Sequence, residues 1–299
     1  MSDKLGQLDM VFVVDNTGSM GPYIENTKRK ILEIIRTIKK EELCKRLRVG
    51  LVSYRDHPPE ESTFVTQKFE LSPDTAKIEE NIRSMNATGG GDGPEAVSDA
   101  IHVANRMEYL RDAAKVMVLI GDAPPHGVEE GDRWPDGPPS GIKWRDEVKK
   151  AYEKGIVIHT VGCFPEIQHY QNAVKTFQEI ASGSEGKFIP LNEAELLVKV
   201  ITGVAIEEID KLAIQEAILK EMGISMDDFD EGEEITDEKI AELASKVQAK
   251  GVRKRALHHA PLAAGAPPAA ESFEMAEEDV SVDDIKEAVR QLKSKKRDD

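Results

Sequence analysis

Short apolar runs that alternate with longer amphipathic segments constrain the fold of this chain more than any other sequence feature. Residues 10–15, 115–123 and 155–163 each hold the kind of apolar run expected of a strand that is buried on both faces of a sheet. Residues 26–40 place isoleucine and leucine on one helical stripe, with lysine and arginine opposite. Because parallel βαβ units produce this alternation, we predict an α/β fold with a doubly wound, mostly parallel central sheet and helices on both faces.

The remaining segments up to about residue 205 fit the same architecture. Further strands are predicted at residues 48–56, 64–71 and 186–191. Further helices are predicted at residues 94–107, 142–155 and 168–182, with another beginning at about residue 193. Ser72 and Pro73 are typical of the cap and the first residue of a helix, so one more helix is predicted to begin there.

The sequence changes character after residue 205. Residues 206–222 are predicted to form a helical extension, and residues 223–279 an acidic and then Ala/Pro-rich linker with one short helix. Residues 280–296 form a predicted amphipathic helix, which we expect either to dock back or to bind a second protein. The extension as a whole is thus predicted to be helical and partly disordered. Since the linker offers little apolar burial, we expect that removing residues 223–299 leaves the melting of the preceding domain nearly unchanged.

Composition excludes several kinds of partner. The chain has 40 Lys and Arg residues against 56 Asp and Glu, a net charge of −16, which disfavours nucleic acid because phosphate binding requires a basic face. Two cysteines are too few for a disulfide scaffold or a Cys-rich zinc site. The sequence shows neither a signal peptide nor an apolar run near the roughly 18 residues of a membrane span, so we expect a cytoplasmic protein without a membrane partner.

Three segments rich in oxygen donors border the predicted strands and helices. They are residues 15–20 after the first strand, residues 121–123 after a later strand, and the Gly-rich residues 86–95 before a helix. In an open parallel sheet such segments meet at the carboxyl edge, where ligands bind. They offer carboxylates and hydroxyls but no histidine or cysteine, a donor set that favours Mg²⁺, Mn²⁺ or Ca²⁺ over zinc.

The spacing of Asp15, Thr17 and Ser19 indicates a cation that also takes an outside ligand. Residues two apart can converge on one side of a locally extended loop. Two of the three donors are neutral hydroxyls, so a bound ion would stay under-neutralised and retain affinity for an external anion. A tight structural calcium site would use more carboxylates. The alternative interpretation is an ordinary strand-end turn, since Asp, Thr, Ser and Gly are all turn formers.

These motifs resemble those of the von Willebrand factor A-type (vWA) domain. The resemblance is carried by D-x-T-x-S-M after a buried first strand, by TGGGDGPEAV and by VLIGDAPPHG, in that order, and it covers about residues 7–205 as the predicted vWA domain. The two later motifs look closest to vWA domains associated with alpha-type protein kinases and to similar microbial vWA proteins. The resemblance implies a metal-ion-dependent adhesion site, in which hydroxyls bind the metal directly and aspartates often act through water.

Carried over residue by residue, the resemblance implies four metal-site residues: Asp15, Thr17, Ser19 and Asp122. A fifth is implied in the Gly-rich loop, where the family usually has threonine. Asp92 aligns best there by its distance to the following helix, and Thr88, four residues earlier, is the alternative. The set is expected to hold Mg²⁺, or else Mn²⁺ or Ca²⁺.

Three further side chains are candidates for the metal or for the rim of the site. Asp56 and His57 follow another predicted strand on the same edge, although entry into the turn before two prolines explains them equally well. His126 lies in the long Pro/Gly-rich loop at residues 123–141, where either rim recognition or simple loop packing accounts for it.

We therefore predict a metal-dependent protein-binding module that recruits a partner's Asp or Glu carboxylate through the cation, in a cytosolic signalling or assembly complex. The alternative is a metal-dependent phosphoryl-transfer enzyme, or the regulatory subunit of a kinase or phosphatase system. No pair of nucleophile and base accompanies the metal ligands in the sequence, so we name no catalytic residue and expect a protein that is not an enzyme.

Overall fold

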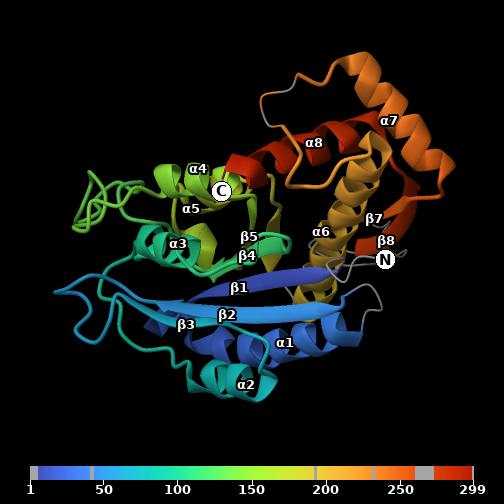
Figure 1. Ribbon diagram of the computed structural model, residues 1–299. Coiled ribbons are helices and arrows are strands. Elements are labelled where there is room, and N and C mark those ends of the chain that lie inside the picture. The colour runs from blue at the N-terminus through green and yellow to red at the C-terminus, as the bar shows by residue number, and fades with distance from the viewer. Residues whose placement is uncertain are drawn as a thin grey trace, which may run out of the picture.

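A central sheet of six strands organises the residues that the computed structural model describes, which are 6–40, 44–191, 194–230, 232, 234–259 and 273–297. The strands lie in the order β3-β2-β1-β4-β5-β6 (Figure 1). Their bounds are β1 Gln7–Asp15, β2 Arg46–Tyr54, β3 Thr66–Ser72, β4 Ala114–Gly121, β5 Ile156–Cys163 and β6 Phe188–Leu191. Neighbouring strands run parallel except β3, which pairs antiparallel with β2 at one edge. The predicted mostly parallel sheet is confirmed.

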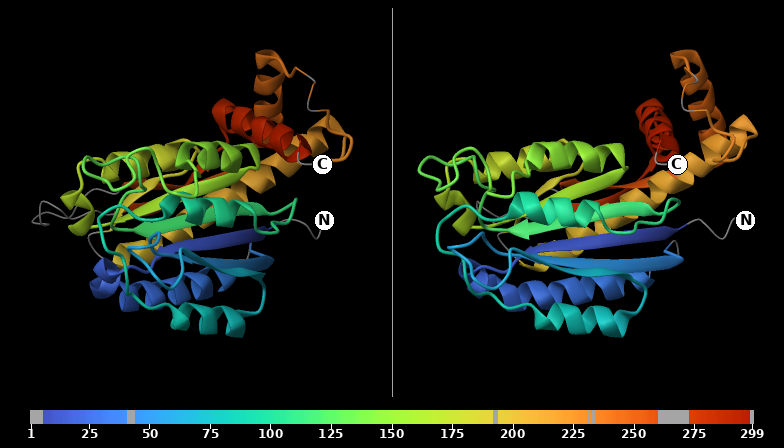
Figure 2. Two further views of the ribbon diagram at one scale, coloured as in Figure 1. Left: turned by 90° about the vertical axis from the view of Figure 1, so that its left-hand side faces the viewer. Right: turned by 60° about the vertical axis from the view of Figure 1, so that its left-hand side comes forward.

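Helices cover both faces of this sheet, as predicted (Figures 1 and 2). One face packs against α1 (Gly21–Lys40), α2 (Thr75–Ser84) and α6 (Ala194–Met222). The other face packs against α3 (Val97–Asn105), α4 (Trp144–Glu153) and α5 (Ala173–Ser182). Short 3₁₀ turns follow two of the strands, η1 (Gly18–Met20) after β1 and η2 (Glu166–His169) after β5.

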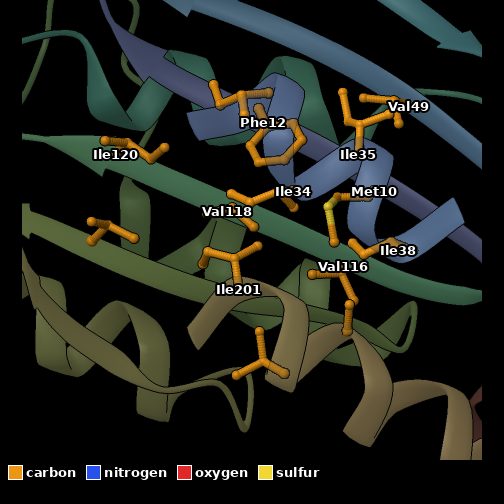
Figure 3. Packing of buried hydrophobic residues seen from close by; sticks show 14 of the residues in the cluster. Met10, Phe12, Ile34, Ile35, Ile38, Val49, Val116, Val118, Ile120 and Ile201 are labelled. Carbon is orange, nitrogen blue, oxygen red and sulfur yellow. The ribbon is translucent and has the colours of Figure 1, made fainter. Parts of the chain in front are cut away.

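The two apolar cores follow from the alternation of side chains along buried strands. On β1, Met10 and Phe12 belong to the core under α1 and α6, whereas Val11 and Val13 belong to the core on the opposite face. Figure 3 shows Met10 and Phe12 among the isoleucines of α1, such as Ile34. Because both faces of the strand are buried, its sequence is continuously apolar rather than alternating.

The start of α2 differs from the prediction. Ser72 is the last residue of β3, and the helix is capped by Asp74 instead. Asp74 Oδ1 accepts hydrogen bonds from the backbone N–H groups of Ala76 (3.0 Å) and Lys77 (3.3 Å). A carboxylate in this position satisfies two of the unpaired donors of the first turn and interacts favourably with the helix dipole, so the helix begins later than predicted.

Helix α6 runs without interruption through the predicted domain boundary at residue 205. Val204, Ala205 and Ile206 are all buried. The change in sequence character after residue 205 therefore does not coincide with a break in the helix, and the predicted extension at residues 206–222 is the second half of α6.

A two-stranded antiparallel sheet occupies part of the predicted linker. Strand β7 (Arg253–His259) pairs with β8 (Phe273–Asp279), and β7 packs on α6. Gly203 of α6 permits this approach, because a Cβ there would lie 2.8 Å from Leu257 Cδ1 and 3.0 Å from Met275 Sδ. The linker prediction is wrong for these two strands, since their pairing joins segments that are distant in sequence.

An ion pair anchors the same small sheet to α6. The carboxylate of Asp210 accepts hydrogen bonds from Arg255 Nε and from an Arg255 terminal nitrogen, both at 3.0 Å, and from the Arg255 backbone N–H at 2.8 Å. Residues 260–272, the rest of the predicted Ala/Pro-rich stretch, lie outside the described residues.

Helices α7 (Asp237–Ala249) and α8 (Val282–Arg297) pack with the end of α6 around a third apolar core. Ile285 of α8, Ile218 of α6 and Val247 of α7 are buried in it. The predicted amphipathic helix therefore docks back, the first of the two expected outcomes. The expectation that the segment after α6 buries little apolar area is wrong.

The C-terminal extension, defined as the described residues after Met222, lies near the amino ends of the sheet strands (Figures 1 and 2). Arg111, in the turn before β4, pairs with Asp227 at 3.2 Å. The Arg290 guanidinium lies 5.6 Å from the ring centroid of Tyr152, which shortly precedes β5. Among the described residues, no helix combines the length and apolar character needed to cross a membrane.

Candidate metal centre

Strands β1 and β4 reach the carboxyl edge of the sheet side by side, and predicted ligands follow both. The chain continues from β1 into α1 on one face and from β4 toward α4 on the other. Such a divergence marks the position at which open α/β sheets bind ligands. Asp15 is the last residue of β1, and Asp122 directly follows β4. The sequence-predicted site therefore lies at the switch point of the sheet.

Asp15, Thr17, Ser19 and Asp122 form one chain of closely spaced oxygens. Asp15 Oδ1 accepts hydrogen bonds from the Thr17 backbone N–H (2.8 Å) and hydroxyl (2.6 Å). The hydroxyl oxygens of Thr17 and Ser19 lie 3.1 Å apart, and Ser19 donates to Asp122 Oδ1 at 3.1 Å. The structure thus brings together the four residues implied by the resemblance, although Ser19 and Asp122 lie 103 positions apart in the chain. We call these four residues the oxygen cluster.

The oxygen cluster fits a hard divalent cation. Asp15 Oδ2 and Asp122 Oδ2 are buried and have no partner in a well-formed hydrogen bond among the described residues, and the buried Tyr54 hydroxyl is the polar group that faces the Asp15 carboxylate. Burial, reinforced by the carboxylate of Asp122, raises the pKa of Asp15 to about 8, and burial also raises the pKa of Asp122. Burial thus disfavours the ionised form of both carboxyls. A bound cation would favour the ionised form and lower both pKa values. Carboxylate and hydroxyl oxygens are ligands suited to Mg²⁺, Mn²⁺ or Ca²⁺.

The Gly-rich loop is hydrogen-bonded to the segment that follows β1. The Thr88 backbone N–H donates to the Asn16 carbonyl at 2.9 Å, and the Gly18 N–H donates to the Gly89 carbonyl at 2.8 Å. The backbone of Thr88 thus supports the loop, while its side chain is exposed. This arrangement gives Thr88 a role in positioning the segment that carries Thr17.

Glu95 is a buried acid at this edge that the sequence analysis does not select. Its backbone N–H donates to the Pro124 carbonyl at 2.9 Å, and a Cβ on Gly90 would lie 2.8 Å from Glu95 Oε1. Burial, followed by the charges of Asp15 and Asp56, raises the pKa of Glu95 to about 11. An acid just before a helix is ordinarily a favourable first-turn charge. Glu95 is buried because the Gly-rich loop packs against the loop that follows β4.

The three rim candidates lie close together, since the ring centroids of His57 and His126 are 5.9 Å apart and the His57 backbone N–H donates to Asp56 Oδ1 at 2.6 Å, but their side chains have different partners. His126 Nε2 lies 2.7 Å from Asp56 Oδ1, and His126 Nδ1 lies 3.0 Å from Asp132 Oδ1. His57 Nε2 lies 3.0 Å from Asp99 Oδ2, on α3. The structure therefore joins Asp56 with His126 and directs the ring of His57 toward a helix.

Asp92 lies together with Asp56 and His126. One ligand atom from each of these three residues lies within 4.8 Å of the other two. Burial and the Asp56 carboxylate raise the pKa of Asp92 to about 6. Gly89 and Gly90, both with positive φ, turn the loop before it reaches Asp92. The structure thus groups Asp92 with Asp56 and His126, and its place in the ligand set implied by the resemblance stays a prediction.

The fold and the oxygen cluster define a doubly wound α/β domain with a polar site at its switch point. The chain belongs to the von Willebrand factor type A domain family, whose model matches residues 9–202. The predicted resemblance to this family is confirmed. vWA domains commonly act as protein-interaction or adhesion modules and are generally not catalytic.

Two curated proteins are similar to part of the chain. Over 122 residues it is 33% identical to the alpha-protein kinase vwkA of Dictyostelium discoideum, a match that covers 41% of this chain and 19% of the kinase. Over 128 residues it is 28% identical to an ariadne-like RING finger protein of Acanthamoeba polyphaga mimivirus, covering 42% of this chain and 12% of that protein. Each match thus spans less than a fifth of the relative's own length.

Among solved structures, the pilus adhesin SpaC of Lactobacillus rhamnosus GG has a similar fold. The alignment has a TM-score of 0.53 and 15% sequence identity, and it covers 70% of this chain and 30% of the adhesin. At this identity the likeness supports the fold alone.

Proposed function

We propose that this chain is a metal-dependent protein-binding module, which recruits a carboxylate of a partner's Asp or Glu to a divalent cation held by the oxygen cluster. The observation that carries the proposal is the continuous chain of oxygens from Asp15 to Asp122, in which one buried oxygen of each carboxylate lacks a described donor. Mg²⁺ is the expected ion, with Mn²⁺ or Ca²⁺ as alternatives.

Each residue of the oxygen cluster has a distinct part in this proposal. Thr17 and Ser19 supply neutral hydroxyl ligands. Asp15 holds the Thr17 hydroxyl, and Asp122 holds that of Ser19, so the two carboxylates orient the two hydroxyls. When bound, the cation supplies a positive charge and an open position for an anionic oxygen. Because two donors are uncharged, that positive charge is only partly neutralised by the chain itself.

The rim loops around the site are braced against one another, which favours a preformed binding surface. Arg133 of the long loop pairs with Glu60 of the loop after β2. Glu129 Oε1 accepts a hydrogen bond from the Asn172 backbone N–H at 2.6 Å, and Asn172 Nδ2 donates to the Val128 carbonyl at 2.7 Å. A preformed rim lowers the ordering cost of binding, so we propose that these loops determine partner specificity.

The cellular setting that we propose is a cytoplasmic signalling or assembly complex. The similarity of 122 residues of this chain to part of an alpha-protein kinase supports a signalling role. The net charge of −16 would repel an acidic partner at long range. Metal coordination and short-range contacts with the rim must therefore provide the attraction.

Chelator-dependent capture tests the proposal. The full chain is immobilised and exposed to cell lysate with Mg²⁺, with EDTA, and with Mg²⁺ restored after EDTA. We expect partner proteins that are retained only with Mg²⁺ and are lost with Ser19→Ala. Ser245→Ala, at an exposed serine of α7, is the matched control and should retain them. Partners retained equally in EDTA and by both variants would refute the metal-bridged model.

A quantitative test follows once a partner is known. Replacing the partner's coordinating Asp or Glu by its amide should weaken binding by about 2–5 kcal/mol, the range for truncating one side of a buried charge pair. Titration calorimetry with Mg²⁺ measures the change. If no single acidic residue of the partner has this effect, a bridging carboxylate is excluded.

A further inference from the structure

Three side chains from three separate segments converge outside the oxygen cluster. Asp56 lies just after β2, Asp92 in the Gly-rich loop, and His126 in the loop after β4. Each offers one ligand atom, and these atoms lie within 4.8 Å of one another. No local sequence spacing produces this arrangement, so tertiary packing has assembled it.

The carboxylates of this group lack the partners that buried acids normally have. Asp56 is fully buried, and its Oδ2 accepts no hydrogen bond from any described residue. Both carboxylate oxygens of Asp92 are shielded from solvent and likewise have no described donor. Buried polar atoms are almost always hydrogen-bonded, so three such oxygens in one place require an explanation. A cation that binds the facing carboxylates provides it.

The imidazole of His126 is held in the orientation that a metal ligand needs. The side chain of Asp132 is buried, and besides facing His126 Nδ1 it accepts hydrogen bonds from the backbone N–H groups of Gly127 (2.6 Å) and Trp134 (2.8 Å). With its position fixed in this way, Asp132 is the natural acceptor of the Nδ1 proton. That tautomer leaves the Nε2 lone pair directed at the carboxylates. The ring of Trp134 lies edge-on at a centroid distance of 4.6 Å and restricts rotation of the imidazole.

From this geometry we propose that Asp56, Asp92 and His126 form a second cation site, which binds a divalent transition metal such as Mn²⁺ or Zn²⁺. Two carboxylates and an imidazole, with a further carboxylate behind the imidazole, are a donor set typical of such metals. Three protein ligands leave at least one coordination position for water or an outside ligand. The presence of nitrogen distinguishes this site from the oxygen cluster, whose donors suit Mg²⁺.

The competing account needs no metal. In it, His126 is a doubly protonated imidazolium that pairs with Asp56 on one side and Asp132 on the other, as in a buried salt bridge. That account satisfies Asp56 Oδ1. A proton shared by the Asp56 and Asp92 carboxyls would satisfy one further oxygen of each and still leave the second buried oxygen of Asp92 without a donor. The two accounts differ in whether a nitrogen-ligated metal binds, and this can be measured directly.

The experiment uses the full chain equilibrated with Mn²⁺, with bound metal counted after gel filtration and its ligands examined by electron spin echo spectroscopy. We expect two Mn²⁺ per chain, one of which shows the nitrogen coupling of a histidine ligand. Asp15→Ala should lose one equivalent and keep the nitrogen coupling. His126→Gln should lose the other equivalent together with the coupling, whereas His258→Gln, an exposed histidine on β7, should change neither.

Asp92→Asn provides a second variant if His126→Gln does not fold, because Asp92 is in a surface loop rather than in a core. It should lose the same nitrogen-coupled equivalent. Absence of nitrogen coupling in the unmodified chain, or coupling that persists in both His126→Gln and Asp92→Asn, would overturn the proposal. Loss of binding in Asp15→Ala alone would instead concern the oxygen cluster, so the two sites are tested separately.

Discussion

The two ends of the central sheet differ in the kind of side chain that they bury. At the carboxyl end, buried oxygens of Asp15, Asp56 and Asp122 have no donor among the described residues. Near the amino ends, α6, α7 and α8 enclose an apolar core, and the buried Asp210 is paired with Arg255. The carboxyl end of the sheet therefore gathers buried carboxylate oxygens without donors, whereas the amino end is covered mainly by apolar packing.

This difference suggests that the carboxyl end of the sheet serves ligand binding, whereas the amino end contributes mainly to stability. Unpaired buried carboxylates destabilise a fold unless a ligand compensates them, and such local inconsistencies are expected at functional sites. Buried apolar side chains contribute stability without any ligand. We therefore expect changes in the C-terminal extension to alter the free energy of unfolding, and changes in the oxygen cluster to alter mainly its dependence on metal.

The largest effect is expected from removing the extension. A chain that ends at Met222 would expose Ile214 and Ile218 of α6, each buried side chain contributing about 1.5–3 kcal/mol. The melting temperature should fall by about 10 °C or more, which thermal unfolding followed by circular dichroism measures. An unchanged melting temperature would break the comparison, because the extension would then not stabilise the sheet domain.

A single core substitution makes the same point without truncation. Ile285 of α8 is fully buried, so Ile285→Ala should reduce the free energy of unfolding by about 2–5 kcal/mol. Val282 on the same helix is 41% exposed, and Val282→Ala is the control, with an expected change of at most about 0.5 kcal/mol. Urea unfolding measures both variants. Equal effects would show that α8 is not held by its buried face.

Metal should stabilise the carboxyl end by mass action. With Mg²⁺ at about one hundred times its dissociation constant, the free energy of unfolding should rise by about 2.7 kcal/mol and return to its starting value in EDTA. Asp15→Asn should abolish the increment, and Ile285→Ala should keep it despite its lower baseline. Urea unfolding in Mg²⁺ and in EDTA tests this. An increment that survives Asp15→Asn would place the Mg²⁺ elsewhere.

The smallest expected effect concerns His159, in the core between the two ends. Burial, then the charges of Lys211 and Lys187, lowers the pKa of His159 from its ordinary value of 6.5 to about 3. Between about pH 3 and pH 6.5 the His159 imidazole is protonated in the unfolded chain but not in the folded one. The free energy of unfolding therefore falls as the pH drops, by about 2 kcal/mol at pH 5. His159→Asn should remove this loss in urea unfolding at pH 7 and pH 5 in EDTA. The same loss in the variant would assign it to other groups.

The success of the sequence analysis depends on how local each signal is. Strands β1, β4 and β5 were predictable because burial on both faces makes their sequences continuously apolar. Strands β7 and β8 were not, since a strand such as RKRALHH has little apolar character and is defined by its pairing with a distant segment. The sequence predicted Ser72 as the cap of α2, whereas the structure has Asp74 in that role. Both residue types are good caps, and the end of β3 at Ser72 decides between them.

The same distinction holds at the site. The sequence alone determined the vWA fold and the oxygen cluster, because Asp15, Thr17 and Ser19 are spaced within one loop and parallel strands bring Asp122 to the same edge. Only the tertiary structure decided that Asp92 lies with Asp56 and His126 and that Glu95 is buried. The physical reason is that local spacing determines which atoms converge within one loop. Which loops face each other, and which side chains they remove from water, depends on the packing of the whole sheet and its helices.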